Sequence, residues 1–294
     1  MSVTLASAIR AVQAEILTAD TDARLVGEMV GQHGGVSGTS AGLLAEFGAE
    51  RVLEVPVADR GTLALAVGMA LGGKTVMVEL SSTGRLPALF EVLANAAAIG
   101  PEFRLHLVVR VPYGHDAAGL DHPVGQSIHR IPGLDVLCPA DASQAAGLLR
   151  YALRSGRPTV FLEPRSLYNS RAVLPAAAIE PNARVLRDGS HVTLAAWGTG
   201  VPAALEAADA LLASGIDAEV IDLVSLSPAN HSVLVASVQR TGRLVVVHPQ
   251  DAVLADAIRQ VGLDGAFLHL ESPLASVVDT ADKVVAAARE SVQY

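Results

Sequence analysis

Residues 75–111 read TVMVELSSTGRLPALFEVLANAAAIGPEFRLHLVVRV, and their pattern indicates the fold class. Two apolar runs of strand length, residues 75–80 and 105–111, lie on either side of an amphipathic, helix-length stretch at residues 86–99. Near-continuous runs of Val and Leu are typical of strands that are buried on both faces of a parallel sheet. A strand, a helix and a strand in this order predict one parallel β–α–β unit.

The same alternation continues in both directions along the chain. Asp141 stands where an N-cap would precede one further helix, and Gly215 where a C-cap would end another. The pattern therefore predicts an α/β protein with two doubly wound domains. The other strands are expected at residues 52–57, 135–137, 159–162, 192–196, 218–221, 244–247 and 267–270, and the other helices at 142–153, 202–213 and 252–261.

The boundary between the domains is expected where this alternation stops. Residues 168–188 read YNSRAVLPAAAIEPNARVLRD, contain Pro175 and Pro181, and hold no sustained strand or helix period. This predicts a first domain at residues 1–170, a linker at 171–188 and a second domain at 189–294.

Composition excludes several classes of protein. Of the 294 residues, 51% are hydrophobic and 17% charged, which argues against disorder, and no run approaches the roughly 18 apolar residues of a membrane span. The first twenty residues lack the basic region and cleavage site of a signal peptide, so a cytoplasmic location is expected. A net charge of −9 argues against nucleic acid, and Cys138, the only cysteine, against disulfides and thiolate metal clusters.

Polar residues follow several of the expected strands, where ligands bind in parallel α/β sheets. Asp59 lies in EVPVADRGT, between a strand and a helix. A carboxylate there can accept a hydrogen bond from a ligand nitrogen or simply cap the helix, and the frequency of Asp at N-caps favours the cap.

A second polar loop, residues 112–130, reads PYGHDAAGLDHPVGQSIHR and holds five His and Asp side chains. Their spacing matches no metal-site signature, so no metal is expected on this chain. A functional loop that faces solvent is favoured over a metal site, and it could bind a phosphate or supply a histidine that transfers protons or binds substrate, because imidazole titrates near neutral pH. The five are His115, Asp116, Asp121, His122 and His129.

Motifs along most of the chain carry a family resemblance. They are LVGEMV at 25–30, GGVSGTSAGLLAEFGAERVLEVPVAD at 34–59, VRVPYG at 109–114, RIPGLDVLCPAD at 130–141 and PTVFLEPRSLY at 158–168. In this order they resemble the β subunit of thiamine-diphosphate-dependent 2-oxo-acid dehydrogenases. The resemblance implies a transketolase pyrimidine-binding domain followed by a transketolase C-terminal domain. It also implies an enzyme that decarboxylates a 2-oxo acid and transfers the acyl unit.

The resemblance assigns roles by position. The carboxylate of Asp59 matches the group that contacts N1′ of the cofactor's aminopyrimidine, and Glu28 matches a second carboxylate near that pocket. Val57 matches an apolar contact beneath the cofactor, and Ser82 lies in a segment that lines the same pocket. His122 matches the histidine that faces the substrate carbonyl.

The resemblance also implies partners. A separate α subunit would hold the diphosphate and Mg²⁺, so the active site is expected to be shared, in an α2β2 tetramer. The substrate is expected to be a small 2-oxo acid or a ketose, with an acyltransferase as a candidate further partner.

Two departures from the family pattern leave alternatives open. Asp59 stands where the family has Glu, which shortens the reach by about 1.5 Å. The segment SSTGR at 81–85 lacks the aromatic residues that stack on the pyrimidine ring. A split transketolase-like ketol transferase and a catalytically silent partner subunit are the alternatives, but the joint presence of Glu28, Asp59 and His122 favours the enzyme.

Overall fold

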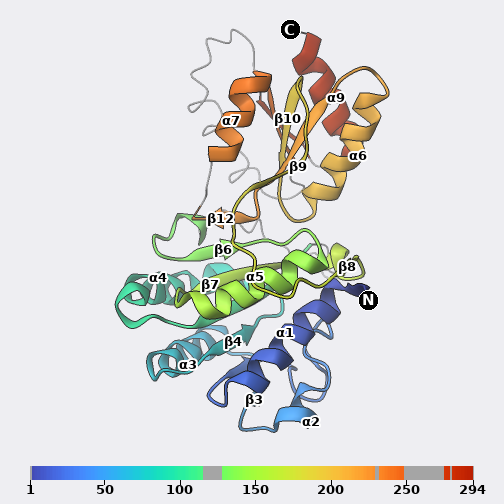
Figure 1. The fold of residues 1–294 in the computed structure, drawn as a ribbon. Helices are drawn as coiled ribbons and strands as arrows, with labels where there is room; N and C mark the ends of the chain where they lie inside the picture. The colour runs from blue at the N-terminus through green and yellow to red at the C-terminus, as the bar shows by residue number, and fades with distance from the viewer. Residues whose placement is uncertain (1, 115–127, 229–231, 248–274, 279, 294) are drawn as a thin grey trace. The chain divides into compact units, whose positions relative to one another are not determined.

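The computed structural model describes residues 2–114, 128–228, 232–247, 275–278 and 280–293, and the chain divides into two compact units (Figure 1). The first unit comprises residues 1–181 and 226–228, and the second comprises residues 182–225 and 229–294. The expected helix at 252–261 and strand at 267–270 lie outside the described residues. No helix in the described part of the chain is both long enough and apolar enough to span a membrane.

A seven-stranded sheet forms the centre of the first unit, in the order β12-β6-β7-β5-β4-β2-β3. All the strand pairs of known register in this sheet are parallel, as the apolar runs predict. The strands are β2 (Arg24–Gly27), β3 (Val52–Glu54), β4 (Val76–Glu79), β5 (Leu107–Tyr113), β6 (Asp135–Leu137), β7 (Thr159–Pro164) and β12 (Ser225–Ser227).

Helices cover both faces of this sheet. Helix α1 packs against α5, and α3 packs against α4 (Figure 1). Because parallel crossovers are right-handed, the strand order puts α3 and α4 on one face and α5 on the other, which is doubly wound topology. The elements are α1 (Leu5–Ala19), α2 (Leu43–Phe47), α3 (Asp59–Leu71), α4 (Leu86–Phe103) and α5 (Ala142–Ser155), with short 3-10 turns η1 (Thr83–Arg85), η2 (Ile128–Arg130) and η3 (Arg165–Leu167).

The second unit holds a five-stranded sheet in the order β14-β13-β10-β11-β9. Its strands pair in parallel except for β9, which runs antiparallel to β11 at the edge. The elements are β9 (Arg184–Arg187), β10 (Val192–Ala196), α6 (Gly200–Leu212), β11 (Ala218–Asp222), α7 (Ser232–Thr241), β13 (Leu244–Val247), β14 (Ala275–Val278) and α9 (Ala281–Gln293).

The segment expected to be a linker, residues 171–188, contains two strands. Arg171–Val173 form β8, which pairs antiparallel with β1 (Ser2–Thr4), and Arg184–Arg187 form β9. Both strands are short and partly exposed, so neither shows the apolar run by which buried strands are recognised. The segment therefore contributes one strand to each unit.

The two expected helix caps have different outcomes. Asp141 caps α5 as predicted, since its Oδ1 accepts a hydrogen bond of 2.7 Å from the amide of Gln144. Gly215 is not the C-cap of α6, because the helix ends earlier, with Ala213 in that position. Gly215 instead takes the left-handed conformation, at φ +80°, in the turn that follows.

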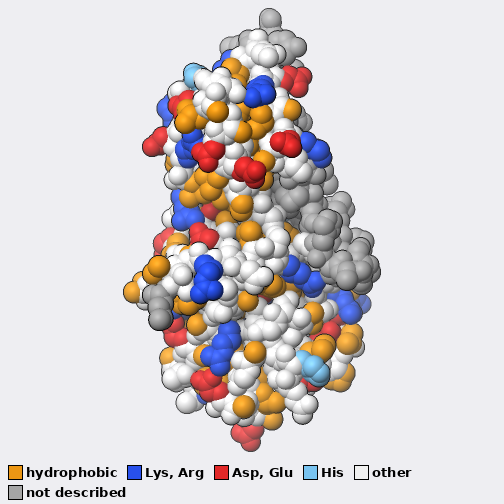
Figure 2. All heavy atoms as spheres, turned by 90° about the vertical axis from the view of Figure 1, so that its right-hand side faces the viewer, with side chains coloured by type: hydrophobic (Ala, Val, Ile, Leu, Met, Phe, Trp, Pro, Cys, Tyr) orange, Lys and Arg blue, Asp and Glu red, His pale blue; other side chains and the backbone are white. Residues whose placement is uncertain are grey.

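The surface carries scattered apolar side chains. Figure 2 shows one face of the molecule, on which hydrophobic and charged side chains are interspersed. Several large hydrophobic residues on helices α3 and α4 are exposed: Leu65, Leu71, Phe90 and Phe103.

Candidate functional site

The strand order of the first unit predicts where a ligand would bind. The chain passes from β2 outward to β3 and then returns to β4 on the other side of β2, so the topology switches between β2 and β4. In open parallel sheets, ligands bind outside the carboxyl ends of the strands at such a switch point. Glu28 directly follows β2, and Ser82 and Arg85 follow β4, so these residues flank that point.

Asp59 and Arg85 form the central contact at the carboxyl ends of these strands, which we call this edge of the sheet. Arg85 Nη1 donates a hydrogen bond of 2.8 Å to Asp59 Oδ2, joining the start of α3 to the turn η1. The other oxygen, Asp59 Oδ1, is buried and has no hydrogen-bond partner among the described residues. The Asp59 carboxylate raises the pKa of Arg85 above its usual value, so the guanidinium stays charged.

The cap interpretation of Asp59 is wrong. Asp59 is the first residue of α3, the N-cap position belongs to Ala58, and within the described chain no side chain caps the helix there. A carboxylate in the first helical turn still interacts favourably with the helix dipole. One carboxylate oxygen of Asp59 accepts the hydrogen bond from Arg85, and the second oxygen remains available to a donor.

Glu28 is the second carboxyl group of the site, and only 9% of the residue is exposed. Burial raises its pKa, the charge of Arg85 opposes this rise, and the charge of Asp59 adds to it. Met29, the next residue, has a left-handed backbone at φ +58°, which is uncommon for a residue other than glycine. Such strain clusters at functional sites, and here it occurs where the chain leaves β2.

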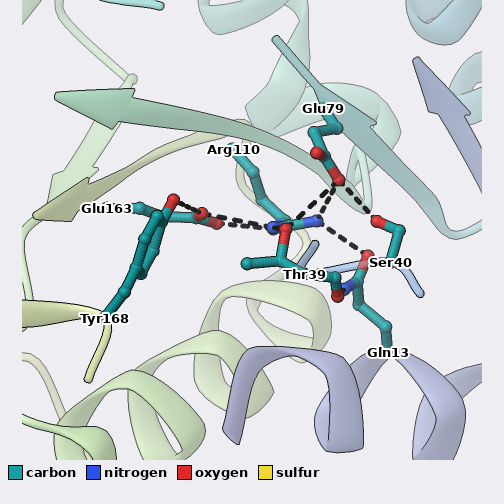
Figure 3. A network of polar contacts seen from close by, with 7 residues as sticks. All are labelled: Gln13, Thr39, Ser40, Glu79, Arg110, Glu163 and Tyr168. Atoms are coloured by element: carbon teal, nitrogen blue, oxygen red, sulfur yellow. Dashed lines mark hydrogen bonds and ion pairs between the residues drawn. The ribbon is translucent and has the colours of Figure 1, made fainter. Parts of the chain in front are cut away.

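A buried ionic network fixes the strands on which this edge is built (Figure 3). Arg110, in the middle of β5, is completely buried and contacts groups from four other segments of the first unit. Its contacts are Nε to Glu163 Oε1 at 2.6 Å, Nη2 to Glu163 Oε2 at 3.2 Å, Nη1 to Glu79 Oε2 at 3.0 Å, Nη1 to Gln13 Oε1 at 2.8 Å, and Nη2 to Thr39 Oγ1 at 2.6 Å.

Two further side chains complete the network. Tyr168 Oη donates to Glu163 Oε2 at 2.8 Å, and Ser40 Oγ donates to Glu79 Oε2 at 2.5 Å. The network thus ties the segment after β2, which contains Thr39 and Ser40, to β4, β5 and β7.

The charges in this network do not balance. Burial alone would lower the pKa of Arg110, but the charges of Glu163 and Glu79 outweigh it and raise that pKa above its usual value. Burial raises the pKa of Glu163, the charge of Arg110 opposes this rise, and the charge of Glu79 adds to it, since one guanidinium faces two buried carboxyl groups. The network is therefore built around a permanently charged arginine.

The remaining predicted site residues are placed as follows. Ser82 is buried and extended just before η1, while Val57 is 63% exposed in this chain, and its contact with a cofactor stays a prediction. His122, with His115, Asp116 and Asp121, lies outside the described residues, and His129 lies in η2. Within the described ranges no group of three His, Cys, Asp or Glu side chains could hold a metal ion.

Sequence reasoning missed Arg85 and the buried network. The signal for Arg85 was a cation after β4, on the same sheet edge as an acidic residue after β3. The signal for the network was a charged residue inside each of three otherwise apolar strand runs, Glu79, Arg110 and Glu163.

Comparisons with known proteins agree with this architecture. Residues 1–171 match the family "Transketolase, pyrimidine binding domain", and residues 182–292 match "Transketolase, C-terminal domain". The "Pyruvate dehydrogenase E1 component subunit beta" of Rhizobium meliloti (strain 1021) is 33% identical over 94% of this chain. The chain spans 63% of that relative's length.

Other relatives carry related names. The mitochondrial pyruvate dehydrogenase E1 β subunit of Saccharomyces cerevisiae is 33% identical, with 94% of this chain and 80% of the yeast protein covered. The corresponding Leifsonia xyli protein is 31% identical, with 94% and 86% covered. These names confirm the resemblance to dehydrogenase β subunits and favour neither the split transketolase nor the silent subunit.

Among solved structures, a split-gene transketolase described as an inactive β4 tetramer superposes with a TM-score of 0.82. It is 23% identical, and 99% of this chain and 98% of that chain are covered. At this identity the superposition confirms the fold and carries no information about activity.

Proposed function

This chain belongs to the family built from a transketolase pyrimidine-binding domain and a transketolase C-terminal domain, and we propose that it is the β subunit of a thiamine-diphosphate-dependent 2-oxo-acid dehydrogenase. With an α subunit it would decarboxylate a 2-oxo acid and transfer the resulting acyl unit. The observation that carries this proposal is Asp59 Oδ1, a buried acceptor without a partner among the described residues, on a carboxylate that Arg85 holds beside the switch point of the sheet.

The residues present fit the pyrimidine end of thiamine diphosphate. A buried carboxylate oxygen that lacks a donor is costly, by about 1–3 kcal/mol, and a ring N–H at this position would satisfy it. Asp59 would accept that hydrogen bond, and Ser82 would line the same edge. When bound, the cofactor supplies the nucleophilic carbon and electron sink for decarboxylation.

Residues of this chain would hold and transfer protons at this edge of the sheet. Asp59 Oδ1 would share a proton with the pyrimidine nitrogen N1′, in surroundings that are partly shielded from water. Glu28 has a pKa shifted upward by burial, which brings it closer to the neutral range where carboxyl groups exchange protons in catalysis. His122 remains a prediction as the residue that faces the substrate carbonyl.

We propose that the diphosphate and Mg²⁺ are held mainly by the α subunit, in an α2β2 complex. The exposed apolar residues of α3 and α4 support a partner, because these two helices pack against each other and both expose large hydrophobic side chains. An acyltransferase is a further proposed partner, and a cytoplasmic location stays a prediction.

The test is a calorimetric titration of thiamine diphosphate with Mg²⁺. It would be run on this chain alone, on its complex with the candidate α subunit, and on complexes carrying Asp59→Ala or the control Asp22→Ala. Asp22 is also an ion-paired aspartate, but it contacts Lys74 at the amino ends of β2 and β4, opposite to the carboxyl ends that carry the site. Binding by the complex that Asp59→Ala weakens and Asp22→Ala leaves unchanged supports the proposal and justifies a 2-oxo-acid screen. A stable complex that binds no cofactor refutes it.

A further inference from the structure

Arg85 is the feature of this edge that the family resemblance does not account for. It lies in the segment where aromatic residues were expected, and it ends the turn η1 immediately before α4. Its side chain reaches Asp59 and is about one third exposed, while the Asp59 side chain is 18% exposed. The pair is therefore partly shielded, which strengthens it relative to an ion pair on the open surface.

The contact with Arg85 makes the two carboxylate oxygens of Asp59 different from each other. Oδ2 accepts the guanidinium hydrogen bond at 2.8 Å, and Oδ1 is left buried with no partner in the described part of the chain. Rotation of the carboxyl group would exchange the two oxygens, and the bond to Arg85 opposes that rotation. An aspartate is also shorter than a glutamate by one methylene, so its carboxyl group has less freedom to find a ligand by itself.

Arg85 also acts on the second carboxyl group of the site. Its positive charge lowers the pKa of Glu28, against the larger effect of burial and with the Asp59 charge opposing it. One guanidinium therefore lies close enough to influence two carboxyl groups that come from the ends of two different strands.

We propose that Arg85 is a positioning residue, which holds Asp59 through Oδ2 and thereby presents Oδ1 to the N–H donor of the bound cofactor. The inference rests on the proposed function, because thiamine diphosphate is the ligand that it concerns. The guanidinium does not itself touch the reacting atoms in this scheme. It replaces an aromatic contact to the cofactor with a hydrogen bond to the residue that recognises the cofactor.

The experiment compares three variants in the complex with the α subunit. Arg85→Met removes the charge but keeps much of the length, and Arg85→Lys keeps a cationic donor. Arg60→Met is the matched control, because Arg60 follows Asp59 at the start of α3 but its side chain contacts Ala88 and Glu91 on α4. Binding of thiamine diphosphate with Mg²⁺ is measured by calorimetry for each.

The proposal expects Arg85→Met to weaken binding by about tenfold or more, since loss of one charge-assisted hydrogen bond has this size. Arg85→Lys should recover most of the affinity, and Arg60→Met should remain within about twofold of the wild type. If Arg85→Met bound thiamine diphosphate as tightly as the wild type or more tightly, the proposal would be overturned, because Arg85 would then not assist cofactor binding.

A second readout does not need the cofactor. The pKa of Glu28 is measured by carbon-13 NMR on the isolated chain, and Arg85→Met should raise it, since the charge that lowers it is gone. Arg85→Lys keeps the charge and should leave this pKa near its wild-type value, and an unchanged Glu28 pKa in Arg85→Met refutes the arrangement. If the wild-type complex binds no thiamine diphosphate, the proposed function fails, and the NMR measurement then decides only whether the Arg85 charge acts on the carboxyl groups of this site.

Discussion

Replacing Arg110 by Met should strongly destabilise the first unit. The substitution removes the cation at the centre of the buried network and leaves Glu79 and Glu163 facing each other without a guanidinium. Arg110 is 0% exposed, so water cannot replace the five lost hydrogen bonds. Breaking a buried ion pair in this way costs about 3–5 kcal/mol.

That loss is large compared with the stability of an ordinary domain, which is about 5–15 kcal/mol. For a unit of this size it corresponds to a fall in melting temperature of about 6–20 °C. Urea and thermal unfolding followed by circular dichroism would measure it. Arg10→Met is the control in the same unit, because Arg10 pairs with Glu46 at an exposed position and should change stability by less than about 1 kcal/mol.

The loss of stability caused by Arg110→Met should also depend on pH. Burial raises the pKa of Glu163, so this group binds its proton more tightly in the folded than in the unfolded chain. The stability that it contributes is therefore complete below the unfolded pKa and is lost as the pH rises through the folded pKa. Arg110 lowers this pKa, so in Arg110→Met the pKa of Glu163 rises further and the variant loses more stability than the wild type as the pH rises. The stability deficit of Arg110→Met should therefore be smaller at about pH 5 than at about pH 7.5.

A triple variant separates charge from packing. Adding Glu79→Gln and Glu163→Gln to Arg110→Met removes the two uncompensated carboxylates and should restore part of the lost stability. If Arg110→Met were no worse than Arg10→Met, or if the two glutamines restored nothing, the buried network could not be what holds these strands.

Three further predictions concern single positions. Gly35→Ala should destabilise the first unit by more than the control Gly38→Ala in urea unfolding. Both glycines have positive φ, but only at Gly35 would an added Cβ clash with the buried Glu79 carboxyl group; equal losses would contradict this. Asp141→Ala should cost about 1 kcal/mol by removal of the α5 N-cap, measured by thermal unfolding, and no loss would show that the cap contributes nothing. Burial raises the pKa of Glu28, so the stability that this group contributes falls as the pH rises through its folded pKa. In Glu28→Gln the urea midpoint should therefore decline less between about pH 4 and pH 8 than in the wild type. An unchanged pH profile would count against the raised pKa.

The sequence predicted those strands whose side chains are buried on both faces. Residues 192–196 and 244–247 form β10 and β13 with the expected bounds, because apolar runs of this length are stable in a folded domain only where both faces of the strand are covered. Strand β2 was missed, since it has only four residues, of which Arg24 and Gly27 interrupt the pattern. Edge strands such as β8 are half exposed and leave no apolar signature.

The candidate site was only partly predictable for a different reason. Asp59 could be singled out because a carboxylate after a strand is chemically informative by itself. Its partner, Arg85, lies 26 residues away in the sequence, and only the parallel pairing of β2 with β3 and β4 brings the two strand ends to one edge. A hydrogen bond of this kind depends on the register of the sheet, which no local pattern reveals.

Strand β12 has a consequence for how this gene can be divided or recombined. Residues 226–228 belong to the first unit although the residues on either side belong to the second, and β12 forms the edge of the seven-stranded sheet next to β6. A truncation after Pro181 would therefore leave β6 with unpaired backbone groups along one side, an edge that invites aggregation. Any exchange of the second half between related genes would also replace one strand of the first sheet. The two halves of the gene therefore cannot be exchanged independently.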